Sequence, residues 1–252
     1  MTTSPTDALL FDVPPPPTPV ERLLHLADQY TQHNDALDLR PLADDAARDA
    51  HVTSARRLAA ATQSAITAIQ SERLYESQEL TEATLRLKQL AFLAGASADL
   101  SATAARELTG LAPEAAVGCA GTVATETRRR RWATLPAKDD QLNAVQRTAL
   151  AEIACGHVTA SSALGREFTR SRDPKVLMST LRALEAKELA ERAFPAASAY
   201  VGGPPLARVR LTPAGITALA SALDRPSARA NTSPIAVPRA LPLAAPSAPR
   251  SR

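Results

Sequence analysis

The sequence predicts a mainly α-helical protein, in which an N-terminal helical bundle or dimerisation region precedes a smaller helical domain with a β-hairpin. Aromatic residues make up only 3% of the 252 residues, while alanine is abundant. This composition favours helices whose cores consist of leucine and alanine. Apolar residues recur at helical spacing through 18–132, and shorter helix and strand patterns alternate in 139–224. These observations indicate the fold class.

Proline-rich segments at the two ends set the domain boundaries. The first 17 residues contain four consecutive prolines, and the last 27 contain six prolines and no acidic residue. Such compositions cannot bury a core, so we expect both ends to be disordered. The expected organisation is a disordered segment at 1–17, a helical region at 18–132, a linker at 133–138, a second domain at 139–224 and a disordered tail at 225–252.

The first domain is expected to contain four helices, and their apolar stripes also suggest self-association. The predicted helices lie around 20–27, 42–74, 77–94 and 98–111. Gly95 and Gly110 are expected to end the last two, and Pro113 reinforces the second stop. The narrow leucine and alanine stripes of 42–111 are too long for one small globule to bury. We therefore expect these helices to form a homodimer.

The second domain is expected to begin with three helices. The first starts near Asp139-Asp140, ends at Gly156, and buries Leu142, Val145, Ala149, Leu150 and Ile153. A shorter helix at 159–171 is expected to turn Leu164 and Phe168 inward. The third, at 174–187, is expected to start at Asp173-Pro174 and to bury Val176, Leu177, Leu181 and Leu184.

Two strands and a last helix complete the second domain. The strands are predicted at 189–194 and 208–212, with a loop rich in glycine and proline between them, and Pro213 opens the final helix. The order helix, helix, turn, helix and hairpin is the winged helix-turn-helix plan.

"LRALEAKELAER" and "VRLTPAGITALA" resemble the recognition-helix end and the segment after the wing in MarR-type winged-helix regulators. The resemblance covers about 139–224. The wing, "GGPPLARVR", lacks the acidic residue and arginine usual in that family, and the long C-terminal dimer helices are absent. The resemblance therefore implies a DNA-binding module rather than the ligand chemistry of the family.

Positive charge gathers where a recognition helix is expected. Residues 164–182 carry five cations against two acids, a net charge of +3 in a short segment. A recognition helix buries one side and presents the other to the major groove, while arginines at the wing base reach phosphate or the minor groove. The expected DNA-binding residues are Arg170, Arg172, Lys175, Ser179, Arg182, Arg208 and Arg210.

These features predict sequence-specific binding of double-stranded DNA, by a transcriptional regulator that acts as a dimer. The alternative is a structural protein that uses its winged helix for protein contacts, for example in plasmid or phage maintenance. Four arginines at 128–131 beside Trp132 allow two interpretations. They form either a solvated hinge between the domains or a strap that contacts phosphates.

No pattern for an enzyme, metal site or cofactor site appears. The sequence lacks a P-loop, GxGxxG, HExxH and a nucleophile–base pattern, and its four histidines are scattered. Cys119 and Cys155 are expected to be buried thiols or, alternatively, a redox-sensing pair. No apolar run is long enough to span a membrane and no secretory signal is recognised, so a cytoplasmic protein is expected. The sequence does not show whether a small-molecule effector exists.

Overall fold

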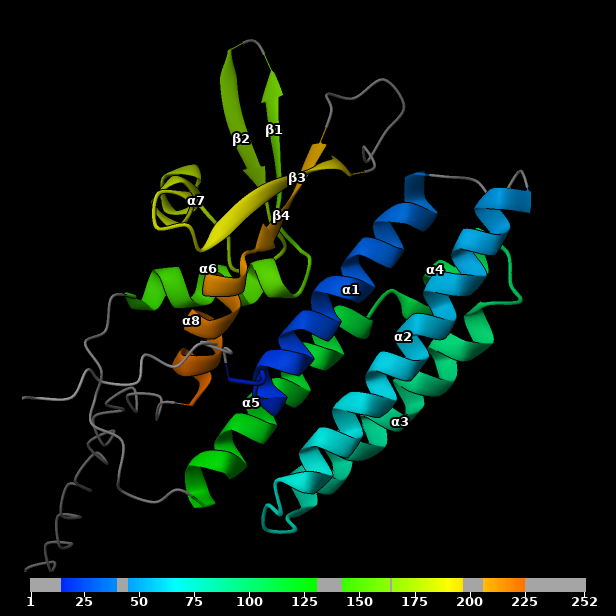
Figure 1. Ribbon diagram of the computed structural model, residues 1–252. Coiled ribbons are helices and arrows are strands. Elements are labelled where there is room, and N and C mark those ends of the chain that lie inside the picture. Colours follow the sequence, from blue (N-terminus) through cyan, green and yellow to red (C-terminus); the bar gives the residue numbers. More distant parts are fainter. Residues whose placement is uncertain (1–14, 40–44, 131–141, 164, 197–205, 225–252) are drawn as a thin grey trace, which may run out of the picture.

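Leucine and alanine at helical spacing pack the first half of the chain into a helical bundle (Figure 1). The computed structural model describes residues 15–39, 45–130, 142–163, 165–196 and 206–224. The bundle contains α1 (Pro19–Leu39), α2 (Asp45–Ser71), α3 (Gln78–Ser97), the short α4 (Ala102–Thr109) and α5 (Ala112–Arg130). α1 and α3 each pack against both α2 and α5, so the four long helices surround one core. Leu23, Ile66, Leu87 and Val123 lie in it, each at most 2% exposed.

The bundle confirms the helices predicted before residue 112, with some changed boundaries. Ser77 caps α3 and Ser101 caps α4, because each hydroxyl accepts a hydrogen bond from a backbone N–H three residues later. Pro113 lies in the first turn of α5, where its missing N–H is tolerated, so it starts a helix as well as following one. The stripes of α2 and α3 are buried within a single chain, so their length is no longer an argument for a homodimer.

The second half of the described chain forms a small α/β module. It contains α6 (Ala144–Ala154), β1 (Thr159–Ala163), β2 (Arg166–Arg170), α7 (Met178–Glu185), β3 (Ala190–Ala196), β4 (Leu206–Leu211) and α8 (Pro213–Leu223). The four strands form an antiparallel sheet in the order β2-β1-β4-β3. The hairpin predicted at 189–194 and 208–212 is therefore confirmed as β3 and β4, and the helix predicted to open with Pro213 is confirmed as α8.

The helix predicted at 159–171 is wrong, because these residues form the β1–β2 hairpin. Ala163 pairs with Arg166, which leaves a two-residue connection that contains Gly165 at a φ of +71°. Glycine adopts this left-handed conformation without steric strain, whereas a helix interior does not use it. The exposure of β2 alternates from residue to residue, as in a strand. Phe168, expected inside, is 50% exposed.

The helix predicted at 174–187 starts later, at Met178. The preceding residues form a loop that side chains hold in place: Val176 N donates to Ser171 Oγ at 2.8 Å, and Thr169 Oγ1 donates to Val176 O at 2.6 Å. Leu177 consequently lies before the helix and is 53% exposed, while Val176, Leu181 and Leu184 are buried as predicted. The described chain thus has no helix-turn-helix pair before α7.

The start of α6 also differs from the prediction. Asn143 is the N-cap, and it exchanges hydrogen bonds with Gln146 in a capping box. Val145, expected inside, is 61% exposed, while Leu142, Ala149, Leu150 and Ile153 are buried. Gly156 ends the helix at a φ of +74°, as predicted. The predictions for the two ends, the linker, Arg131, Trp132, Asp139, Asp140 and the side chain of Leu164 concern residues outside those that the structure describes.

The two halves share a continuous apolar core. α8 packs against α1 and α5. At the end of α5, Arg128 donates to Leu223 O at 3.2 Å, Arg129 pairs with Glu126 at 2.6 Å, and Arg130 donates to Glu72 O. These cations suit the negative end of the helix dipole. Arg128–Arg130 lie in the last turn of α5, and both interpretations, a solvated hinge and a phosphate strap, stay predictions.

Candidate nucleic-acid interface

β2 presents a row of two arginines and an aromatic ring. Successive side chains of a strand point to opposite faces, so Arg166, Phe168 and Arg170 share one face, and all three are exposed. In the hairpin, Phe168 lies opposite Ser161 and Arg170 opposite Thr159. These small partners leave the long side chains of β2 accessible along the strand. Arg166 has no carboxylate partner among the described residues.

The other face of β2 fastens the strand to α7 and β3. Glu167 accepts hydrogen bonds from Arg192 at 2.7 Å and from Arg182 at 3.0 Å. Arg192 first, and Arg182 second, lower the pKa of Glu167 to about 2. Arg192 also donates to Glu185 at 2.6 Å, and these two carboxylates raise the pKa of its guanidinium. The network fixes the position of α7 beside the hairpin.

The predicted recognition residues of the α7 region are exposed. Lys175 precedes the helix and Ser179 lies in its first turn. Arg182 is 64% exposed, with one carboxylate partner in Glu167. Since Arg192 also binds Glu167, the carboxylate keeps a cationic partner when Arg182 moves away from it. Arg182 thus lies beside the hairpin, on the side of β2 opposite to the row of Arg166, Phe168 and Arg170.

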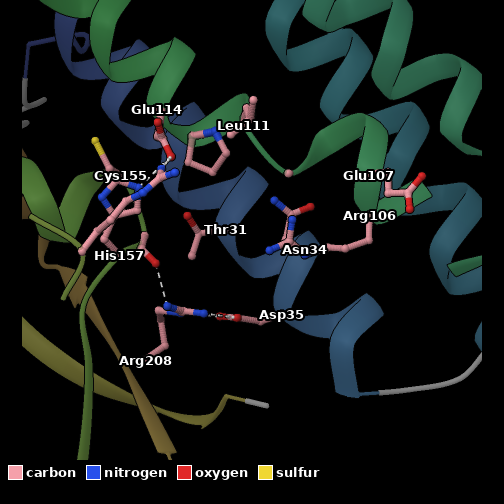
Figure 2. Close-up of a pocket in the computed structure, with 14 residues that line it drawn as sticks. Thr31, Asn34, Asp35, Arg106, Glu107, Leu111, Glu114, Cys155, His157 and Arg208 are labelled. Atoms are coloured by element: carbon pink, nitrogen blue, oxygen red, sulfur yellow. Dashed lines mark hydrogen bonds and ion pairs between the residues drawn. The ribbon is translucent and has the colours of Figure 1, made fainter. Parts of the chain in front are cut away.

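Of the remaining predicted residues, Arg170 is part of the β2 row, whereas Arg172 points elsewhere. The Arg172 guanidinium is 64% exposed and pairs with Glu114 of α5 at 2.5 Å. This pair lies at the junction of the bundle and the sheet module, in the cavity shown in Figure 2. Arg172 therefore belongs to the junction between the bundle and the sheet module, and not to the β2 row.

Arg208 and Arg210 are not at the base of a wing. Alternate residues of β4 point to the sheet face that packs on α1, where Arg208 binds Asp35 and Arg210 binds Asp28 (Figure 2 shows the first pair). Their side chains are 17% and 26% exposed. Asp28 raises the pKa of Arg210 further. The prediction that these two arginines reach DNA does not match this placement, because the position of α1 across the sheet was not visible in the sequence.

Arg166 and Phe168 were missed as site residues by the sequence analysis. The five letters R-E-F-T-R alternate large exposed and half-buried residues with a period of two, which indicates a strand. Read as a helix, the same segment turned Phe168 inward. The preceding Gly165 connection was the signal for a hairpin.

The two cysteines of the described residues lie in surroundings that disfavour the thiolate form. Burial raises the pKa of Cys119 to about 11 and, with nearby Glu152 and Glu114, raises that of Cys155 to about 12. Both free thiols are therefore protonated at neutral pH and weakly nucleophilic. Among the residues that the structure describes, no three histidine, cysteine or carboxylate side chains lie close enough together to hold a metal ion.

Comparison of the chain with family models, curated proteins and solved structures gave no match. Among the helices that the structure describes, none combines the length and the apolarity that a membrane crossing requires. The functional argument accordingly depends on the geometry of the hairpin and α7.

Proposed function

We propose that the protein binds double-stranded DNA through the β1–β2 hairpin and the exposed side of α7. The observation that carries the proposal is the exposed row of Arg166, Phe168 and Arg170 on β2. β2 belongs to a hairpin that projects from the module near α7 (Figure 1). The complete surface consists of Arg166, Phe168, Arg170, Lys175, Ser179 and Arg182. We call it the hairpin–α7 surface.

Each part of this surface has a role in the proposal. A two-stranded ribbon or a helix fits the major groove of DNA. Arg166, Arg170 and Lys175 contact phosphates and set the register, while Ser179 and Arg182 read base edges. The ring of Phe168 packs on sugars or bases between its two arginines. Since the surface combines phosphate contacts with groups that read bases, we infer sequence preference and a role in transcriptional regulation.

Selection of bound fragments from random duplex DNA tests the proposal. The wild-type protein is expected to enrich a common sequence, and Arg166→Ala and Lys175→Ala to lose most of that enrichment. Arg56→Ala is the matched control, because Arg56 is an exposed arginine of α2 in the bundle. Recovery of only random fragments with the folded wild-type protein would reject sequence-specific binding.

A second candidate function is a protein contact made by α3. Leu85 and Phe92 lie two helical turns apart and are 55% and 74% exposed. Such a face suits a homodimer or another protein partner. We retain the homodimer as a proposal on this observation. Light scattering of the full chain tests it: a dimer that Phe92→Glu converts to a monomer supports this face, and a monomeric wild-type protein rejects self-association.

A further inference from the structure

A cavity of about 480 Å³ lies where the bundle meets the sheet module (Figure 2). α1 contributes Thr31 and Asn34, the α4–α5 corner contributes Leu111, and the turn after α6 contributes Gly156 and His157. The volume lies within the usual range of small-molecule sites. The cavity is separate from the hairpin–α7 surface.

One part of the cavity wall is already saturated by hydrogen bonds and serves as a scaffold. Arg208 donates to both carboxylate oxygens of Asp35, at 2.9 and 2.5 Å, and to Gly156 O at 2.6 Å. Thr109 Oγ1 donates to Asn34 Oδ1 at 2.6 Å, and Asn34 Nδ2 donates to Thr109 O at 3.0 Å. These groups fix the shape of the cavity and leave little capacity for a ligand.

A second group of side chains retains unused acceptors. Glu114 accepts from Arg172 at 2.5 Å and from His157 Nε2 at 2.8 Å, and both bonds end on Oε1. Its Oε2 has no hydrogen bond from a described residue. Glu107 also lines the cavity, is exposed, and has no described ion-pair partner. Carboxylate oxygens in two places can therefore accept hydrogen bonds from a cationic group.

The same cavity retains unused donors. Arg106 uses Nε to bind Asp38 at 3.1 Å, and Arg172 uses one terminal nitrogen to bind Glu114. Each guanidinium has five N–H donors, so both keep donors for an anionic group. Leu111, which is 67% exposed, and Pro113 add apolar surface between the charged groups.

We propose that this cavity binds a small amphoteric molecule of dipeptide size, which carries both an ammonium and a carboxylate group. The ammonium binds Glu114, and the carboxylate binds Arg106 on the other side of Thr31 and Asn34 (Figure 2). A ligand with only one charge makes only one of these two contacts. An apolar side chain contacts Leu111 and Pro113.

Calorimetric titration of the full chain with three related probes tests the charge requirement. L-leucyl-L-leucine carries both charges, N-acetyl-L-leucyl-L-leucine lacks the ammonium, and L-leucyl-L-leucinamide lacks the carboxylate. The first is expected to bind saturably, and each of the others to bind about tenfold more weakly, since a charge-assisted contact is lost. Equal affinity for the three probes, or no saturable binding of L-leucyl-L-leucine, would overturn the proposal.

Variants locate the binding in the cavity. Glu114→Gln and Arg106→Gln are each expected to weaken L-leucyl-L-leucine binding about tenfold. Glu76→Gln is the control, because Glu76 is an exposed carboxylate of the segment before α3. Circular dichroism confirms that the variants are folded. Unchanged affinity in both cavity variants would place any binding elsewhere and reject this site.

Discussion

At the scale of the residue, a pair of buried histidines in the bundle shows how burial changes the pKa of a side chain. The rings of His33 and His51 stack with centroids 5.3 Å apart, and each is 4% exposed. His33 Nδ1 lies 2.9 Å from Ser54 Oγ, and His51 Nε2 donates to Ser97 O at 2.8 Å. Burial first, and the neighbouring His51 second, lower the pKa of His33 to about 4. The neutral ring is therefore the form that the fold accommodates.

This pair predicts a loss of stability in mild acid. Between about pH 6.5 and pH 4, the unfolded chain holds a proton at His33 that the folded chain does not, so the free energy of unfolding falls as the pH falls. The expected loss through this window is roughly 2–3 kcal/mol. His33→Leu removes this part of the pH dependence. Urea denaturation across the window measures both proteins, and parallel curves for the two would contradict the assignment.

Glycine substitutions test the backbone at two positions. Gly165 has a φ of +71° in the hairpin connection, while Gly95 lies inside α3, and a Cβ at either meets no atom within 4 Å. The backbone conformation, and not a steric clash, therefore decides how each substitution changes the stability. Gly165→Ala is expected to destabilise the fold by about 1 kcal/mol, and Gly95→Ala to stabilise it by about 0.5–1 kcal/mol. Chemical denaturation checks both values, and a stabilising Gly165→Ala would contradict the hairpin geometry.

At the scale of elements, α7 separates two leucines that the sequence places on the same side. Leu181 is fully buried, but Leu177 precedes the helix and is 53% exposed. Leu181→Ala is expected to lower the free energy of unfolding by roughly 2–5 kcal/mol through a core cavity. Leu177→Ala is expected to change it by less than about 1 kcal/mol. Thermal and urea unfolding compare the two, and equal losses would show that Leu177 is packed.

α1 to α4, α6, α8 and the β3–β4 hairpin could be predicted from the sequence, whereas α5 and the β1–β2 hairpin were missed. In α2 and α3 the apolar period repeats often enough to define one face. Residues 159–170 offer only five residues on each strand, and serine, alanine and arginine fit either structure. Gly165 and the alternation around Phe168 were the available signals for a strand. The hairpin displaced the expected helix and changed the predicted site from a helix pair to a hairpin and one helix.

At the scale of the molecule, two ion pairs join the sheet module to the bundle. Asp28 and Asp35 lie two turns apart on α1, and they meet Arg210 and Arg208, which alternate on β4. Both pairs can form only if the strand runs along the helix in roughly the opposite direction. A sequence cannot show such a match, since the paired residues are more than 170 positions apart. This explains why the two arginines were assigned to DNA.

A double-mutant cycle measures one of these pairs. Arg208→Gln is expected to destabilise the protein by about 3–5 kcal/mol, because it leaves the Asp35 carboxylate in a largely buried position without its partner. Asp35→Asn alone is similarly destabilising, and the double variant loses less than the sum of the two. Urea denaturation gives the three values. Strict additivity would show that the pair is not coupled.

The salt dependence of duplex affinity tests the hairpin–α7 surface most directly. The account predicts that the wild-type protein binds duplex DNA more weakly as salt rises, and that Arg166→Ala lowers the slope of log affinity against log salt by about one phosphate contact. Arg56→Ala keeps the wild-type slope. Fluorescence anisotropy of a labelled duplex measures all three proteins. A folded wild-type protein without salt-dependent binding, or an Arg166→Ala protein with unchanged affinity and slope, would contradict the account.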